Sequence, residues 1–158
     1  MNTASALVFC TAALLTACAP LPPAAPSSSA NLKSEVAAFL DDYVSAVGSR
    51  DAARIRNAYV TDDRFVWIED GKVRYRKVDE VLASLSTFPP AATIRTELKD
   101  VSVVAVGPSA AHAWATFRTS VNQGQSGFAF GGAISFVLER QGTSWKVVGG
   151  HTSSPGQR

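Results

Sequence analysis

The spacing of hydrophobic residues predicts helices in the first half of the chain. Between residues 36 and 47 apolar side chains recur every three or four positions, at Val36, Phe39, Leu40, Tyr43, Val44 and Val47. This period is typical of an amphipathic helix, for which Asn31 or Ser34 is available as the N-cap and Gly48 as the end. The sequence therefore predicts one long helix with a single face against a core.

Two shorter helices are predicted after the first. Asp51 suits the N-cap of a helix over 52–59, because its carboxylate can accept hydrogen bonds from the first backbone N–H groups. Residues 78–85 have a further helical pattern, which Pro89 and Pro90 stop. All three predicted helices thus precede residue 90.

A β-hairpin is predicted between the second and third helices. Asp70-Gly71 is a preferred two-residue type I′ turn, and it separates the strand-like segments 64–69 and 72–77. The turn sets one aliphatic face, the better candidate for the core, from Val66, Ile68, Val73 and Tyr75. Phe65 and Trp67 then lie opposite two arginines on the other face, either as exposed cation–π pairs or as the rim of a pocket.

The period of the hydrophobic pattern changes to two in the second half. Four segments rich in Val, Phe, Thr and Trp are separated by turns that contain glycine: 94–106, 110–122, 127–140 and 144–152. They predict an antiparallel meander. Residues 31–153 therefore predict an α+β domain whose N-terminal helices pack on one face of a bent antiparallel sheet, followed by a tail over 154–158.

The last hairpin decides where a candidate histidine points. A type II′ turn at Gly142 sets His151 opposite Ile134, on an apolar face that includes Phe136. Such a histidine is either a hydrogen-bonded structural residue or a titratable group that faces a cavity. The adjacent Gly149-Gly150 indicates a bulge, or the close approach of a ligand or of another backbone.

The N-terminal residues have the composition of a leader and a tether. Residues 4–17 are uncharged and apolar, too few for the roughly 20 residues of a membrane-spanning helix but enough for the core of a signal peptide. Residues 18–30 contain Pro and Ser and no charge, which favours an extended tether. If residues 1–17 are removed, Cys18 is the one cysteine left, and no internal disulfide can form.

Composition and charge exclude several classes of function. The 158 residues are 46% hydrophobic and 18% charged, which suits one globular domain. A net charge of +2 is far below the basic surface that nucleic acid requires, so no nucleic-acid partner is expected. Two histidines without a cysteine partner cannot supply a zinc site, and no phosphate-binding loop or nucleophile elbow is present. We expect no metal and no cofactor.

Few residues are candidates for acid–base chemistry or for an interface. The acids and imidazoles of the four C-terminal segments are Glu97, Asp100, His112, Glu139 and His151. Tyr43 on the first helix would meet His151 across the core, where the two could polarise a carbonyl. Trp114 and Arg118 share the opposite face of their strand from Phe117, and would line either a cavity or an interface.

Two family resemblances add to these predictions. Leu15-Thr16-Ala17-Cys18 resembles the bacterial lipobox, which implies a lipid on Cys18 and attachment to the cell envelope, at the periplasmic side of the outer membrane in a Gram-negative cell. Residues 49–68 and 144–154 resemble the nuclear transport factor 2-like superfamily and its SnoaL-like members. This second resemblance implies a cone-shaped sheet with a cavity between the helices and its concave face.

The sequence leaves three functions open. The leading hypothesis is a lipid-anchored, noncatalytic domain that binds a small apolar ligand or a protein partner, with membrane contact through the lipid alone. Its predicted pocket residues are Tyr43, Tyr59, Trp67, Trp114, Arg118, Phe136 and His151. The alternative is an isomerase, dehydratase or cyclase acting on a small hydrophobic substrate, with His151 as base and Tyr43 as donor. The third is a homodimer formed through the sheet face around Trp114.

Overall fold

The computed structural model describes residues 29–155. In chain order its elements are α1 (Ser29–Ser49), α2 (Ala52–Ala58), β1 (Val66–Glu69), β2 (Lys72–Tyr75), α3 (Val78–Ser86), β3 (Thr93–Gly107), β4 (Ala110–Gln123), β5 (Ser126–Gln141) and β6 (Ser144–Ser153). The predicted leader, the lipid attachment at Cys18 and most of the tether lie outside the described residues. No helix in the described part of the chain is long and apolar enough to cross a membrane.

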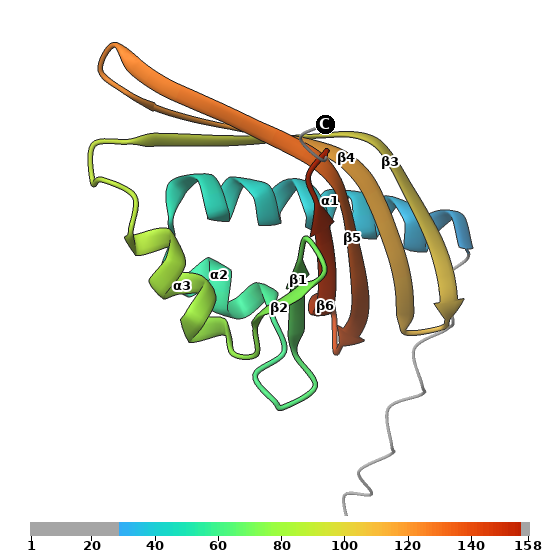
Figure 1. Ribbon diagram of the computed structural model, residues 1–158. Helices are drawn as coiled ribbons and strands as arrows, with labels where there is room; N and C mark the ends of the chain where they lie inside the picture. The colour runs from blue at the N-terminus through green and yellow to red at the C-terminus, as the bar shows by residue number, and fades with distance from the viewer. Residues whose placement is uncertain (1–28, 156–158) are drawn as a thin grey trace, which may run out of the picture.

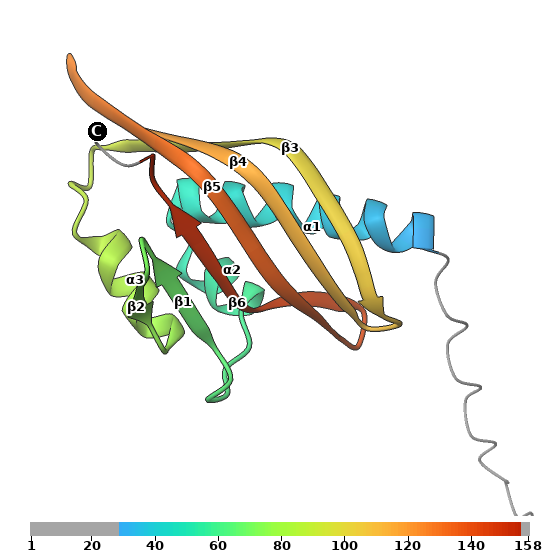
Figure 2. The same cartoon turned by 45° about the vertical axis from the view of Figure 1, so that its right-hand side comes forward.

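The strands form one curved sheet in the order β2-β1-β6-β5-β4-β3. Figure 1 shows the long strands β3, β4 and β5 bending over α1, with α2 and α3 beside the short β1–β2 hairpin, and Figure 2 shows the same curvature from the side. The sequence predicted an antiparallel sheet. The observed sheet is mixed, because β1 pairs with β6 in parallel. The prediction missed this pair since it treated the first hairpin and the meander separately.

The predicted hydrophobic stripe of α1 packs on the concave face of the sheet. Buried residues of α1 face buried residues of β4, β5 and β6, namely Leu32, Val36, Leu40, Tyr43 and Ala46 against Ala111, Ala113, Ala115, Ile134, Phe136, Leu138, Trp145 and Val147. Leu32 lies one turn before Val36, so the stripe begins one turn earlier than predicted, and the helix begins at Ser29, before both predicted caps. The core of the domain therefore lies between α1 and the sheet.

The end of α1 is set by packing and not by a glycine cap. A side chain at Gly48 would meet the carbonyl oxygen of Ile94 at 2.9 Å, so this position is small because β3 passes close to it. The helix ends one residue later, and Arg50 takes the left-handed conformation with a φ of 53°. The Arg50 guanidinium donates hydrogen bonds to carbonyls of the α3–β3 loop, including that of Pro90 at 2.7 Å.

The first hairpin has the predicted turn but the opposite buried face. Asp70 and Gly71 both have positive φ angles, as a type I′ turn requires. A bulge between Trp67 and Ile68 sets Trp67 opposite Tyr75. Phe65 and Trp67 are almost fully buried, whereas Val73 is 48% exposed. The prediction of an aliphatic core face was wrong, because the larger aromatic side chains fill the interior.

A second bulge reverses the face of His151. The register near the Gly142 turn is as predicted as far as Leu138 opposite Val147, and it then shifts by one residue. His151 therefore lies opposite Ser135 instead of Ile134, since one extra residue moves every later side chain to the other face. Two of the alternatives for the glycines hold, a bulge and a close backbone. The bulge lies beside Gly149, and a Cβ atom at Gly149 or Gly150 would lie 2.7 Å from the Val66 carbonyl oxygen or 2.5 Å from that of Ser135.

Candidate functional site

The concave side of the sheet contains a cavity of about 160 Å³, called the inner cavity here. Its walls come from the C-terminal half of α1, from α3, and from strands β1 to β6. The apolar part of the lining is Val44, Val47, Trp67, Val81, Leu85, Phe117 and Ile134. The polar part consists almost wholly of hydroxyl groups, from Tyr43, Tyr59, Tyr75, Ser84, Thr96, Thr119 and Thr152. A mainly apolar wall with a few polar groups is typical of a small-molecule site.

Two buried tyrosines face each other in the inner cavity. The hydroxyl oxygens of Tyr43 and Tyr59 are 2.8 Å apart, and either one can be the donor. Tyr43 projects from α1, whereas Tyr59 follows α2 and forms a β-bridge to Val147, which fixes it below the helix. Edge-to-face contacts hold both rings, Tyr43 against Phe136 and Tyr59 against Phe65. We call this pair the tyrosine dyad.

The tyrosine dyad can donate one hydrogen bond to a bound molecule. The two hydroxyls have two O–H protons, and their mutual hydrogen bond uses one of them. The described residues supply no acceptor for the second proton. Burial raises the pKa of Tyr43 to about 12 and the pKa of Tyr59 well above its ordinary value. Both groups are therefore neutral at pH 7 and act as donors toward an oxygen atom.

Two further hydroxyl pairs complete the polar lining. Tyr75 donates a hydrogen bond of 2.8 Å to Ser84, and this bond joins β2 to α3. The hydroxyls of Thr96 and Thr119 are 2.9 Å apart across β3 and β4. Thr119 is buried, and its pairing lowers the cost of a polar group in the core.

Within the described part of the chain, Glu69 is the one charged residue that lines the inner cavity. It follows Trp67 by two positions in β1, so both side chains point to the concave face. Burial raises the pKa of the Glu69 carboxyl, and Arg74, whose nitrogen lies 3.4 Å away, offsets part of that rise. Sequence reasoning missed Glu69 because it looked for acids only in the C-terminal segments. The alternation from a buried Trp67 was the signal that could have identified it.

Four predicted pocket residues belong to this region. Tyr43, Tyr59 and Trp67 line the inner cavity directly. Phe136 lies behind them, with its ring 5.5 Å from that of Tyr43 and 5.8 Å from that of Trp67. The structure therefore places these four aromatic residues together around the inner cavity.

The other three predicted pocket residues lie on the outer face of the sheet. His151 is placed there by the bulge in the last hairpin. Trp114 lies opposite Ser135, is 42% exposed and has its ring 5.3 Å from that of His112. Arg118 lies opposite Glu97 and is also exposed. Trp114 and Arg118 were predicted to line either a cavity or an interface. Because they lie on the outer face, they cannot line the inner cavity, and the interface is the role that stays open.

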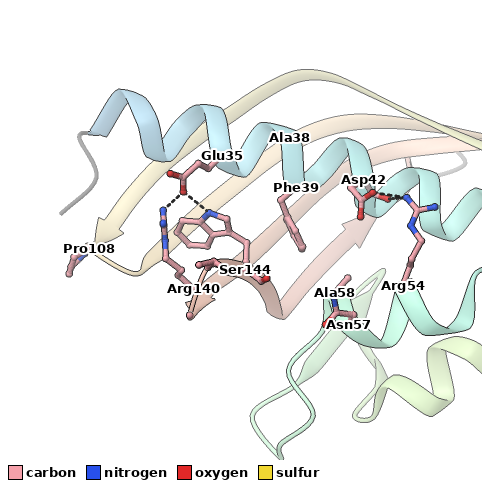
Figure 3. A pocket seen from close by; sticks show the side chains of 13 residues that line it. Glu35, Ala38, Phe39, Asp42, Arg54, Asn57, Ala58, Pro108, Arg140 and Ser144 are labelled. Carbon is pink, nitrogen blue, oxygen red and sulfur yellow. Dashed lines mark hydrogen bonds and ion pairs between the residues drawn. The ribbon is translucent and has the colours of Figure 1, made fainter. Parts of the chain in front are cut away.

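A second and larger hollow of about 870 Å³ lies between α1, α2 and the β5–β6 turn, and is called the outer groove here. Figure 3 shows Glu35 of α1 above Arg140 and an indole ring. Arg140 donates to the Glu35 carboxylate, and the Trp145 indole N–H donates to it at 3.4 Å. The Arg140 guanidinium also stacks over the Trp145 ring, 4.8 Å from its centre.

The charged side chains of the outer groove form ion pairs with one another. At its other end Arg54 forms an ion pair of 2.6 Å with Asp42 (Figure 3). Within residues 29–155 the buried side-chain nitrogens and oxygens have partners except for Arg140 Nε, which is covered and cannot reach a ligand. The described residues also contain no group of three side chains able to hold a metal ion.

Solved structures show the class of fold that this curved sheet and inner cavity define. A nuclear transport factor 2-like superfamily protein from Salmonella enterica is 16% identical with a TM-score of 0.69, and the match covers 81% of this chain and 94% of that one. A protein of this type from Rhodospirillum rubrum, described as of unknown function in nutrient uptake, is 19% identical with a TM-score of 0.63, over 77% and 98% of the chains. A Caulobacter vibrioides protein with a cystatin-like fold is 15% identical with a TM-score of 0.62, over 78% and 89%.

The family follows from the sequence itself. The model of the SnoaL-like domain matches residues 36–157, so the chain belongs to the SnoaL-like domain family. The domain is thus an α+β, nuclear transport factor 2-like fold, as the sequence predicted. No curated protein matches the chain.

Proposed function

We propose that this protein is an envelope lipoprotein whose SnoaL-like domain binds a small, mainly apolar molecule with one oxygen that accepts a hydrogen bond. The observation that carries the proposal is the tyrosine dyad, which keeps one O–H proton without an acceptor among residues 29–155, inside an apolar cavity. A ketone or alcohol oxygen would accept a hydrogen bond from that O–H group, and the aliphatic and aromatic walls would hold the rest of the molecule.

The charge of the inner cavity favours a neutral ligand. Glu69 is acidic, and none of the described lysines, arginines or histidines lines the cavity. A carboxylate or phosphate would therefore meet an acidic group, and the cation beside that group, Arg74, does not line the cavity to bind the anion. This supports neutral oxygen compounds over fatty acids and phosphate esters.

The envelope location rests on the resemblance of residues 15–18 to a lipobox. The structure supports it in one respect, since α1 begins at the end of the domain away from α3, which lines the inner cavity (Figure 1). An anchor before Ser29 would leave the cavity free. We expect Cys18→Ser to release the protein from the membrane fraction and to remove the lipid mass from its N-terminus. A Cys18→Ser protein that keeps both would contradict the anchor.

The binding proposal is tested with two probes of similar size. The full chain carrying Cys18→Ser is titrated calorimetrically with cyclohexanone and with cyclohexanecarboxylate. We expect cyclohexanone to bind at least ten times more tightly than cyclohexanecarboxylate. Both can accept a hydrogen bond from the dyad, but the carboxylate also brings a negative charge close to Glu69. Equal binding of the two, or none of the ketone, would contradict the proposal.

A second candidate function is proton transfer on the bound molecule. Glu69 has a raised pKa and shares the cavity with the tyrosine donors, which is the pairing of a base with a group that stabilises an oxyanion. Glu69 thus replaces His151 as the base, whereas Tyr43 keeps its predicted role as donor. Exchange of the α-hydrogens of cyclohexanone into D₂O, abolished by Glu69→Gln, would demonstrate this activity. Unchanged exchange in Glu69→Gln would remove it.

A homodimer through the outer face is the remaining part of the proposal. Val104, His112 and Val137 lie side by side on neighbouring strands next to Trp114. The side chains of Val104, Trp114 and Val137 are between 42% and 52% exposed. We expect sedimentation to show a dimer that Trp114→Arg converts to a monomer. A monomeric parent protein at high micromolar concentration would contradict this part alone.

A further inference from the structure

The apolar wall of the inner cavity continues beyond it on the β4–β5 hairpin. Phe117 lines the cavity, and its ring lies edge-to-face with Phe130 at a centroid distance of 6.2 Å. Phe130 in turn stacks with Phe128, also at 6.2 Å. We call these three residues the phenylalanine ladder.

The phenylalanine ladder lies on the same side of the sheet as the cavity. Phe130 is opposite Thr119, which lines the cavity, and Phe128 is opposite the buried Val121. Residues paired across antiparallel strands project to the same face. The two rings therefore extend the concave surface outward from the cavity.

The outer part of the ladder is uncovered in the described residues. Phe128 is 58% exposed and Phe130 is 43% exposed. The last pair between β5 and β6 is Ala133 with Ser153, so the hairpin continues past the end of β6. Figure 1 shows this hairpin projecting beyond the rest of the sheet. Residues 126–132 contain no charged side chain, so this inner surface is wholly apolar or small.

The size of the cavity indicates that a complete ligand would need such an extension. Ligand pockets commonly measure about 300 to 1,000 Å³, whereas the inner cavity measures about 160 Å³. The hydroxyl groups and Glu69 lie in the cavity, and the ladder has none. The polar end of a ligand would thus lie inside, with its apolar end outside.

We propose that the phenylalanine ladder is the second half of the ligand site, and that the ligand class is a neutral amphipathic molecule with an unbranched hydrocarbon chain. Its carbonyl or hydroxyl head accepts from the tyrosine dyad, and its chain lies along Phe117, Phe130 and Phe128. The absence of a cation in the cavity lining, together with Glu69, disfavours an ionised head. This inference rests on the proposed binding function.

The test is a series of methyl ketones from pentanone to dodecanone, titrated calorimetrically into the full chain carrying Cys18→Ser. We expect the affinity to rise up to about fourfold for each added methylene until the chain passes Phe128. In the double variant Phe128→Ala, Phe130→Ala the short ketones bind as before, and the long ones gain nothing from their length. Phe128→Leu, Phe130→Leu retains most of the dependence on length, because the surface stays apolar.

A matched control is an exposed valine outside the cavity, the ladder and the proposed dimer face. Val73 of β2 is 48% exposed and lies opposite Ile68. Val73→Ala should leave the whole ketone series unchanged. Thermal unfolding followed by circular dichroism checks that every variant is folded.

The outcomes separate this inference from the proposed function. If pentanone binds and longer chains bind no better, the ladder is not part of the site and the cavity proposal remains. If no ketone binds, both fail. If the double variant dissociates a dimer in sedimentation and leaves ketone binding unchanged, the ladder is a contact between copies and the inference is overturned. Dodecanoate binding as tightly as dodecanone would overturn the neutral head.

Discussion

The inner cavity and the outer groove differ in how much of their hydrogen-bonding capacity the protein itself uses. The outer groove is several times larger, at about 870 Å³ against about 160 Å³. Its carboxylates are already paired, Glu35 with Arg140 and Asp42 with Arg54. The inner cavity instead keeps a neutral O–H proton on the tyrosine dyad for which the described residues offer no acceptor. Unused hydrogen-bonding capacity, and not volume, therefore distinguishes the better candidate site.

The Glu35 contact and the tyrosine dyad also have different roles. The contact of Glu35 with Arg140 and Trp145 joins the first turns of α1 to the β5–β6 hairpin, residues more than a hundred positions apart. It contributes to the fold. The tyrosine dyad joins α1 to the segment after α2 in the core, where a ligand oxygen can complete it.

The largest expected effect comes from breaking the Glu35 contact. We expect Glu35→Ala to lower the free energy of unfolding by about 2 kcal/mol, less than for a fully buried pair because Arg140 keeps 20% of its side-chain surface exposed. Urea unfolding measures the loss. The binding of cyclohexanone should not change.

Asp42→Ala is the matched control for that variant. It removes another acid of α1 from the same groove, but Asp42 is 67% exposed and its ion pair with Arg54 is solvated. We expect a loss of at most about 0.5 kcal/mol. If Glu35→Ala instead abolished ketone binding without loss of stability, the outer groove would be a functional site and the comparison would be wrong.

A smaller effect is expected from the tyrosine dyad, and it falls on binding. Tyr43→Phe or Tyr59→Phe alone leaves one hydroxyl, which can turn to the ligand, so each should weaken cyclohexanone binding only slightly. The double variant removes the donor and should weaken binding by about tenfold, which corresponds to the net worth of one hydrogen bond near 1.4 kcal/mol. Calorimetric titration of all three variants measures the difference.

The double variant also distinguishes the two regions. Its loss of affinity should be specific to molecules with an oxygen acceptor, so the binding of methylcyclohexane is the control. Equal losses for both compounds would mean that the dyad only shapes the cavity. In that case its hydroxyls would be structural, as the charges of the outer groove are.

The elements of this fold follow from local periodicity, but the faces of two strands do not. The predicted helices and the four long strands match the structure closely, because spacings of 3.6 and 2 report burial directly. One bulge beside Trp67 and another beside Leu138 each shift the register by one residue. The second shift explains why His151 was expected inside the core. Trp67 was placed on the other face because the aliphatic residues of β1 were assigned to the core, and the first bulge changes only its partner, to Tyr75.

The pairing of Tyr43 with Tyr59 lies beyond any local pattern. Tyr43 belonged to the predicted stripe, but its partner is 16 residues away in a segment that leaves α2 and bridges to β6. Glu69 was missed for a related reason, since its inward direction depends on which face of β1 is buried. Candidate residues could thus be predicted where the periodicity of one helix or strand decides which way their side chains point. They could not be predicted where the contact between two elements decides it.

The smallest expected effect is the pH dependence that Glu69 adds to stability. Burial raises the pKa of the Glu69 carboxyl above its ordinary value, with Arg74 acting in the opposite direction. A carboxyl with a raised pKa in the folded state favours folding while it is protonated, and that contribution is lost as the pH rises through the folded-state value. Glu69→Gln should therefore gain stability relative to the parent protein as the pH rises from the acidic range to neutrality. Urea unfolding across this range measures the change, and Glu97→Gln, an exposed acid on β3, is the control. A stability difference for Glu69→Gln that stays constant with pH would show that the cavity does not bury the carboxylate, and the base role proposed for it would lose its support.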